Sequence, residues 1–148
     1  MFPAKFRRAG EEELARMQLA PYLFFDGTCE EALEFYAEVL GGKISEINRF
    51  ADSPMGENMP PEHRDRIMHA TFVAPGMTLM ASDGSDGQGE MRRASLSIAT
   101  ADRVQGARVF SALAAGGTVT MPYAKQLWGA SFGMLVDKYG IRWMVNAG

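Results

Sequence analysis

The sequence has few of the residues that form disulfides, bind metals or contact nucleic acids. It contains one cysteine, Cys29, and two histidines in 148 residues. A single cysteine can form neither an internal disulfide nor a thiolate metal cage, so we expect a cytoplasmic protein. Lys and Arg number 15 against 18 Asp and Glu, which gives a formal net charge of -3. This balance offers no basic surface for a phosphate backbone, and we expect no nucleic-acid partner.

Long apolar runs are also absent. No run approaches the ~18 residues of a membrane span, so we expect no membrane partner. The first 16 residues mix Lys5, Arg7 and Arg8 with glutamates and lack the apolar core of a secretory signal. We interpret residues 1–17 as an N-terminal extension: a mobile arm, a short helix or an arm of a dimer. The remainder, with 47% hydrophobic residues in the whole chain, fits one soluble globular domain over 18–148.

Turn and cap residues divide the first half of this domain into a β-α-β-β-β module. Thr28 is a candidate N-cap for a helix that ends at Gly41-Gly42. A stretch over 52–65 is rich in Pro, Gly and Glu, and it predicts a long surface loop. The predicted strands are Leu19–Phe25, Lys43–Phe50, Ile67–Val73 and Met77–Ser82, the last two forming a hairpin around Pro75-Gly76.

The second half repeats this order. Asp102 is a plausible N-cap, and the next helix again ends at a double glycine, Gly116-Gly117. Aligning the two double glycines also aligns Phe35 with Phe110. The predicted strands are Ala94–Ala99, Thr118–Tyr123, Ser131–Val136 and Ile141–Asn146. We therefore predict an α+β domain of two modules, 18–82 and 92–148, joined by a linker over 83–91.

Several short motifs follow one another in a fixed order from Gln18 onward. They are Pro21–Gly27, Cys29–Tyr36, Gly41-Gly42, His69-Ala70, Leu79–Asp83, Trp128-Gly129, Phe132-Gly133 and Asp137–Trp143. This set resembles the vicinal oxygen chelate superfamily (glyoxalase, bleomycin resistance protein, extradiol dioxygenase), within its PhnB-like branch. The resemblance implies that the two modules form a curled, cup-like mixed sheet with helices on its outer face, usually in a homodimer.

Some members of this branch carry the name 3-demethylubiquinone-9 3-methyltransferase. The chain, however, lacks a glycine-rich turn after a first parallel strand with an acidic partner downstream, so we expect no nucleotide-type cofactor. In metal-dependent relatives the ligands lie on the first and last strands of each module. Counted in register, these positions are Pro21, Arg93, Met80 and Met144, none of which is a good ligand for a hard metal. We therefore expect no metal and no cofactor.

Strand alternation gives a candidate lining for the cup. If the four positions above point inward, Leu23, Phe25, Ser95 and Arg142 follow them, while Leu96, Ile98, Trp143 and Val145 pack under the helices. Trp128 and Phe132 could form an aromatic lip, or pack in the core or in a dimer interface. The candidate ligand-binding residues are Phe25, His69, Met80, Arg93, Ser95, Trp128, Phe132, Arg142 and Met144.

Three of these assignments have open alternatives. A two-residue turn at Pro75-Gly76 pairs His69 with Ser82, whereas a three-residue turn places it on the other face. Arg93 and Arg142 could instead be solvated or paired with Glu90 and Asp137. Elsewhere, Cys29 stands at a helix N-terminus, where its thiol pKa could be lowered, but a buried structural thiol is the default.

Two functions follow from this lining. The favoured function is a metal-independent protein that binds a small, partly apolar organic anion, because apolar walls with hydroxyls and guanidinium groups suit such a ligand. The alternative is a metal-dependent isomerase, lyase or dioxygenase with a rearranged site that uses His69 and a carboxylate. The two functions differ in whether they require a divalent metal ion, so metal binding distinguishes them.

Overall fold

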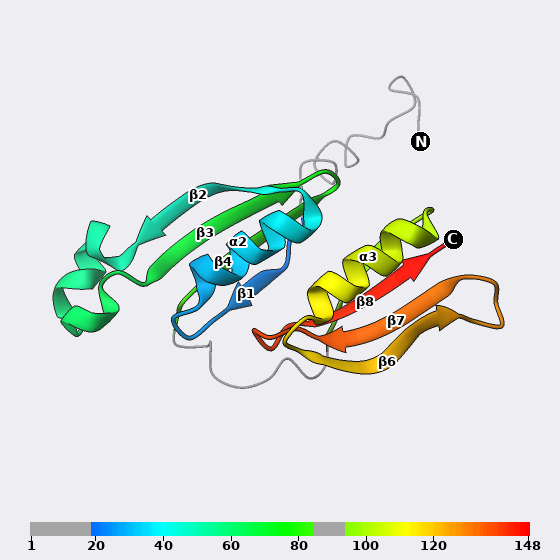
Figure 1. The fold of residues 1–148 in the computed structure, drawn as a ribbon. Helices are drawn as coiled ribbons and strands as arrows, with labels where there is room; N and C mark the ends of the chain where they lie inside the picture. Colours follow the sequence, from blue (N-terminus) through cyan, green and yellow to red (C-terminus); the bar gives the residue numbers. More distant parts are fainter. Residues whose placement is uncertain (1–18, 85–93) are drawn as a thin grey trace, which may run out of the picture.

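The computed structural model describes residues 19–84 and 94–148, which form two four-stranded sheets, each with one long helix (Figure 1). The predicted extension, 1–17, and most of the predicted linker lie outside the described residues. The strand orders are β1-β4-β3-β2 and β5-β8-β7-β6. The strands are β1 (Tyr22–Phe24), β2 (Lys43–Arg49), β3 (Ile67–Ala74), β4 (Met77–Ser82), β5 (Leu96–Thr100), β6 (Thr118–Lys125), β7 (Ser131–Val136) and β8 (Arg142–Ala147).

Both sheets are mixed, as predicted. In each, the first strand runs parallel to the last, and the remaining pairs are antiparallel. The helices α2 (Cys29–Leu40) and α3 (Arg103–Ala114) lie on the same side of the sheets (Figure 1). No helix of the described residues packs on the opposite faces, which are called the uncovered faces below. The α+β class and the two β-α-β-β-β units are therefore confirmed.

Helix α2 begins differently from the prediction. The Thr28 side chain makes no capping hydrogen bond. Instead, Asp83 Oδ1 accepts hydrogen bonds from the backbone N–H groups of Gly27 and Cys29, both at 2.9 Å. Its other oxygen accepts one from the N–H of Ile67 at 3.0 Å. A carboxylate from the end of β4 thus satisfies the N-terminus of α2 and fixes it to the sheet.

The predicted cap of α3 is confirmed. Asp102 Oδ1 accepts hydrogen bonds from the N–H groups of Val104 at 2.9 Å and Gln105 at 3.2 Å. The segment between β2 and β3, predicted as a loop, instead contains three short 3₁₀ helices. These are η2 (Phe50–Asp52), η3 (Pro54–Asn58) and η4 (Pro61–His63).

A double glycine follows each helix: Gly41 is the C-cap of α2, and Gly116 comes directly after Ala115, the C-cap of α3. Gly41 has φ 73° and Gly116 has φ 76°, a left-handed conformation in which a Cβ atom is strained. A Cβ on Gly42 would collide with the carbonyl oxygen of Val73, and one on Gly117 would collide with that of Val136. The first glycine therefore reverses the chain, and the second lets it pass against the neighbouring strand.

One buried carboxylate joins the two modules. Asp137, at the turn before β8, is 3% exposed. Its Oδ2 accepts hydrogen bonds from Tyr36 Oη of helix α2 at 2.6 Å and from Trp143 Nε1 at 2.9 Å. Its Oδ1 accepts the N–H groups of Tyr139 at 2.9 Å and Ile141 at 3.0 Å. Burial and the nearby Asp137 charge raise the pKa of Tyr36 well above its usual range, so this phenol stays a donor.

None of the helices in the described parts of the chain is long and apolar enough to cross a membrane.

Candidate functional site

The uncovered face of the second sheet carries the side chains that the sequence assigned to it. Trp143 and Val145 are buried in the core, and their parallel partners Leu96 and Ile98 pack against it. Alternation then places Met144 on the uncovered face, opposite Ser97. The inward and outward sets predicted for this module are therefore confirmed for β5 and β8.

For the first sheet, the predicted orientation of β1 is wrong. Leu23 and Phe25 are 5% and 2% exposed and belong to the core, where the Phe25 ring packs edge-on against Tyr139. Tyr22 and Phe24, 38% and 40% exposed, lie on the uncovered face instead. Parallel pairing explains the shift, since Tyr22 stands opposite Met80 and Leu23 opposite Ala81. Phe25 is therefore not available on the uncovered face for ligand contact.

Arg142 lies at the start of β8, on the uncovered face. It is half-buried, and none of the described residues forms a hydrogen bond or ion pair with its side chain. The carboxylate of Asp137, one candidate partner, is fully used by Tyr36, Trp143 and two backbone N–H groups. The other candidate partner, Glu90, lies outside the described residues, as does Arg93. Extending the β5–β8 register by one residue places Ser95 opposite Arg142.

A groove of about 570 Å³ lies between the two modules; Arg142 does not line it, but the next residue, Trp143, and the residue opposite Arg142, Ser95, do. Leu19 and Pro21 line it from before β1, and Met77 and Thr78 from the β3–β4 hairpin. The second module contributes the β5 residues and their neighbour Ser95. The groove thus combines apolar side chains with three hydroxyl groups and exposed backbone, and both modules contribute to it. The full lining is Leu19, Pro21, Pro75, Gly76, Met77, Thr78, Leu79, Ser95, Leu96, Ser97, Ile98, Ala99 and Trp143.

His69 lies on the uncovered face of the first sheet. The hairpin has a two-residue turn, with Ala74 opposite Met77 and Ala70 opposite Ala81. Extending this register pairs His69 with Ser82, which is the first of the two predicted alternatives. Its imidazole contacts Tyr22 and Thr71, and Glu46 lies nearby. The sequence analysis did not single out Tyr22 or Glu46.

Trp128 and Phe132 come together at the other end of the second module. Their ring centroids are 6.1 Å apart in an edge-on arrangement, and Trp128 is 65% exposed. Phe132 pairs with Asn146, on the same face as Met144. Within one chain, Trp128 is not a core residue, and it remains a candidate for the aromatic lip or for an interface.

The superfamily's metal positions hold no hard-metal ligands where the structure describes them. Met80 and Met144 lie on the uncovered faces, and Pro21 lines the groove. Across residues 19–84 and 94–148, no three His, Cys, Asp or Glu side chains gather in a group that could hold a metal ion.

Cys29 is the first residue of helix α2, and it is buried. Its side chain is 0% exposed, and burial, followed by the charges of Asp83 and Glu30, raises the pKa of its thiol to about 12. The structure thus agrees with a structural thiol rather than an activated one.

We expect the Cys29 thiol to resist alkylation in the native protein. Incubation with iodoacetamide at pH 8 should leave the native chain unmodified by mass spectrometry, and 6 M guanidinium chloride should expose one reactive thiol. Rapid native alkylation at pH 8 would show that the thiol is accessible and ionised, contrary to its burial.

Comparison with known proteins identifies the family. The model of the 3-demethylubiquinone-9 3-methyltransferase family matches residues 17–146. Protein YjdN of Escherichia coli (strain K12) is 31% identical over 88% of this chain and 95% of its own length. The chain belongs to the 3-demethylubiquinone-9 3-methyltransferase family.

Solved structures of similar proteins agree with this assignment. Protein PA1353 from Pseudomonas aeruginosa is 40% identical over 88% of this chain and 97% of its own, with a TM-score of 0.78. A PhnB protein from Bacillus cereus, described as a 3-demethylubiquinone-9 3-methyltransferase, is 27% identical over 89% and 100%, with a TM-score of 0.76. The predicted PhnB-like branch is thus confirmed.

The fold is shared with a more distant solved structure. A glyoxalase/bleomycin resistance protein from Albidiferax ferrireducens T118 is 16% identical over 89% of this chain and 98% of its own, with a TM-score of 0.57.

The Asp83 carboxylate already occupies the N-terminus of α2 in this member of the 3-demethylubiquinone-9 3-methyltransferase family. In doubly wound folds, a helix N-terminus of this kind binds phosphate.

Proposed function

We propose that this protein binds a small organic anion on the uncovered faces of its sheets, without a metal ion. The half-buried Arg142 carries the proposal, because no described residue neutralises its guanidinium group. A guanidinium that is partly removed from water and unpaired favours a carboxylate or phosphonate partner, which it can bind through two parallel hydrogen bonds.

The groove that Ser95 and Trp143, the neighbours of Arg142, help to line suits the apolar part of such a ligand. Its volume, about 570 Å³, lies within the ~300–1,000 Å³ of small-molecule sites. Thr78, Ser95 and Ser97 supply hydroxyls that can accept or donate hydrogen bonds, and the other lining side chains are apolar. A small anion with a short hydrocarbon or aromatic body fits this lining.

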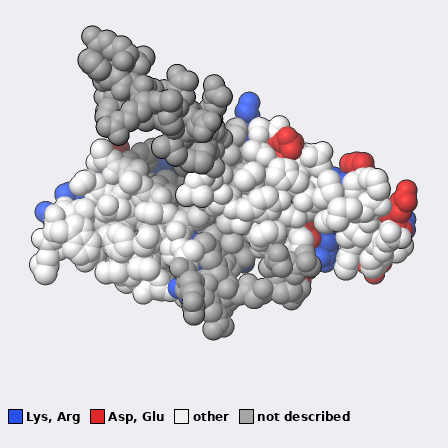
Figure 2. All heavy atoms as spheres, turned by 180° about the vertical axis from the view of Figure 1, so that it is seen from behind, with Lys and Arg blue, Asp and Glu red and all other residues white. Residues whose placement is uncertain are grey.

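The charge distribution of this side of the molecule supports the same proposal. Viewed from the side away from the helices, the visible described surface is largely uncharged across its middle, and charged residues lie mainly toward its ends (Figure 2). Few carboxylates on the middle of this visible described surface would repel an approaching anion.

Replacing Arg142 with methionine tests this function. We expect a panel of small carboxylates and phosphonates, screened by saturation-transfer NMR in EDTA, to give hits whose affinity falls about 10- to 100-fold in Arg142→Met, the usual value of a charge-assisted hydrogen bond. Arg108→Met is the matched control, since Arg108 is exposed on helix α3.

Two outcomes would oppose the proposal. Equal affinities for the wild type and Arg142→Met would show that the Arg142 guanidinium does not bind the ligand. Binding that appears only with added divalent metal, and is lost in His69→Ala, would support the metal-dependent alternative instead.

A further inference from the structure

Strand β5 forms a free edge of the second sheet. It pairs with β8 on one side, and no strand of the described residues pairs with its other side. In a parallel pair, alternate residues direct both backbone groups toward the partner strand, and the residues between them direct both away. The Thr100 carbonyl accepts a hydrogen bond of 3.0 Å from the N–H of Gly148, directly after β8. The N–H and C=O groups of Ser97 and Ala99 therefore point away from β8.

The first residues of β4 form a similar edge in the first module. Strand β1 begins opposite Met80, whose N–H donates a hydrogen bond of 2.9 Å to the carbonyl of Pro21. Two residues earlier, Thr78 directs its backbone groups to the same side. In this register the Thr78 carbonyl would need a donor at position 21, and proline has no N–H. Thr78 therefore has no backbone partner on this side among the described residues.

The groove between the modules runs along these two edges. Five consecutive residues, 95–99, line it, although successive side chains of a strand point to opposite faces. The groove therefore follows the backbone edge of β5 and not one face of the sheet. Thr78 lines the groove from the other module. Because Thr78, Ser97 and Ala99 are all exposed, their free backbone groups are open to a ligand.

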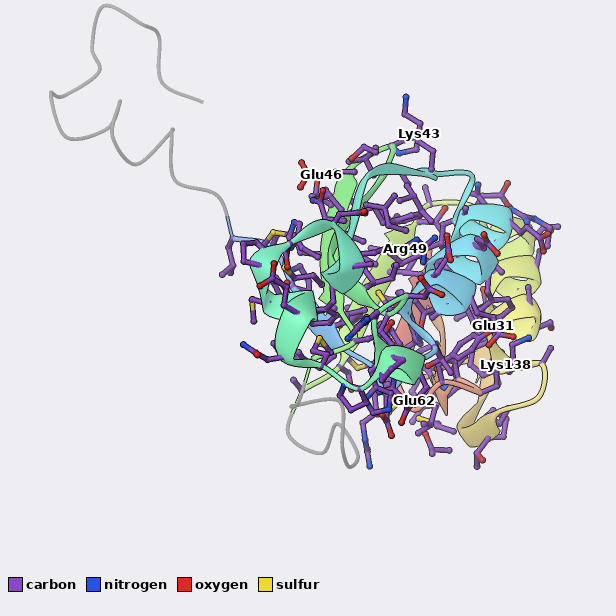
Figure 3. All side chains as sticks on the ribbon, turned by 90° about the vertical axis from the view of Figure 1, so that its left-hand side faces the viewer. Glu31, Lys43, Glu46, Arg49, Glu62 and Lys138 are labelled. Carbon is purple, nitrogen blue, oxygen red and sulfur yellow. The ribbon has the colours of Figure 1, made fainter. Side chains whose placement is uncertain are left out.

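Strand β5 lacks the features that keep sheet edges from pairing with other chains. Natural edge strands are protected by charged side chains, by proline or by a very short length. Of the other edge strands, β2 carries Lys43 and Glu46 (Figure 3), β6 contains a proline and Lys125, and β1 has three residues. Strand β5 has five residues, none of them charged and none a proline. It is thus the edge that is open to pairing.

We propose that an extended peptide segment of a partner protein binds in this groove and pairs its backbone with the free edge of β5. Alternating N–H and C=O groups at the spacing of a strand are a property of polypeptide chains, and strand addition is a general mode of peptide recognition. None of the residues that line the groove is charged, which favours a segment without charges. The inference goes beyond the anion site proposed above, because it rests on backbone groups and does not need Arg142.

Amide hydrogen exchange with an uncharged peptide tests the pairing residue by residue. The probe is the capped pentapeptide acetyl-Thr-Val-Ser-Val-Thr-amide, added to the ¹⁵N-labelled full chain. With saturating peptide, we expect the N–H groups of Ser97 and Ala99 to exchange at least about 10-fold more slowly, because they gain hydrogen bonds. The N–H of Ile98 already points toward β8, so its exchange should change little and provides the internal control.

Methylation of the peptide tests whether its own backbone forms the hydrogen bonds. An extended peptide directs its N–H groups alternately to its two sides. One derivative is therefore N-methylated at its second and fourth residues, and the other at its third and fifth. We expect one of the two to bind at least about 10-fold more weakly than the parent peptide, because it loses two hydrogen bonds, and the other to bind about as well.

Two variants of one residue test the edge of the protein. Ala99→Pro removes an N–H that β8 does not use, and proline is tolerated where an edge N–H faces solvent. It should weaken peptide binding at least about 10-fold, whereas Ala99→Ser, which keeps the N–H, should bind like the wild type. Circular dichroism checks the fold of both variants, and the methylated peptides provide a test that needs no substitution in the protein.

Several results would overturn the proposal. These are no binding of the parent peptide, equal binding of all three peptides, or binding that leaves the exchange of Ser97 and Ala99 unchanged. Slow exchange of these two N–H groups before any peptide is added would also oppose it, since a second copy or another part of this chain would then already pair with β5. The carboxylate panel and Arg142→Met test the anion site separately, so that either proposal can fail while the other stands.

Discussion

Replacing Asp137 with alanine is expected to lower the free energy of unfolding by about 3–5 kcal/mol, the cost of removing one partner from a buried charged network. The carboxylate accepts four hydrogen bonds, from Tyr36 Oη, Trp143 Nε1 and the N–H groups of Tyr139 and Ile141. Alanine would leave these buried donors without a partner. Urea denaturation followed by tryptophan fluorescence and circular dichroism measures the change.

Tyr36→Phe tests the one hydrogen bond of this network that links the two modules. Tyr36 belongs to the first module, whereas the other donors lie near Asp137 in the second. Tyr36→Phe removes one donor, and we expect a loss of about 1.5–3 kcal/mol, the value of a hydrogen bond to a charged group. Because Tyr36 acts through Asp137, the double variant should be much less destabilised than the sum of the two. Asp52→Ala, at an exposed site, should change stability by less than about 0.5 kcal/mol. Additive effects of Tyr36→Phe and Asp137→Ala would show that Tyr36 does not act through Asp137, and would contradict a stabilising hydrogen bond between the modules.

The second glycine of each pair should be the less replaceable one. Gly117→Ala is expected to cost about 3 kcal/mol, because its Cβ would overlap the Val136 carbonyl oxygen and the Asp137 backbone, which cannot move aside like a side chain. Gly116→Ala should cost about 1–2 kcal/mol, since it imposes a left-handed conformation on alanine but meets only the flexible Lys138 side chain.

Thermal and urea unfolding of the two glycine variants checks this order. The corresponding pair in the first module, Gly42→Ala and Gly41→Ala, should show the same order, because Gly42 meets Phe72 and the Val73 carbonyl while Gly41 has open space. If the first glycine of each pair were the costlier one, backbone conformation rather than close packing would explain the double glycines.

The fold was predictable where residues near in sequence decide the structure. The double glycines and the Asp102 cap define the helix ends, and Leu96, Ile98, Trp143 and Val145 separate cleanly from the residues between them. The repeat of these signals gave the two modules. The α2 cap was not predictable, because the capping group, Asp83, lies 54 residues beyond Cys29 in the chain.

The candidate site was only partly predictable, for a related reason. Residues 21–25 are almost all apolar or aromatic, so the sequence does not show which alternate residues face the core. The parallel pairing of β1 with β4 decides this instead. As a result, Tyr22 and Phe24 lie on the uncovered face, where Leu23 and Phe25 were predicted. Glu46 was missed because only strand pairing brings it to His69.

The most direct test of the proposed site is a map of amide chemical-shift changes in ¹⁵N-labelled protein titrated in EDTA with the tightest-binding carboxylate or phosphonate of the screened panel. We predict that the largest changes cluster at β1, β5, the start of β8 and the β3–β4 turn, and that Arg142→Met abolishes them at the same ligand concentration. Changes confined to the outer surfaces of the helices or to residues 50–66, or a pattern unaffected by Arg142→Met, would contradict an anion site on the uncovered faces.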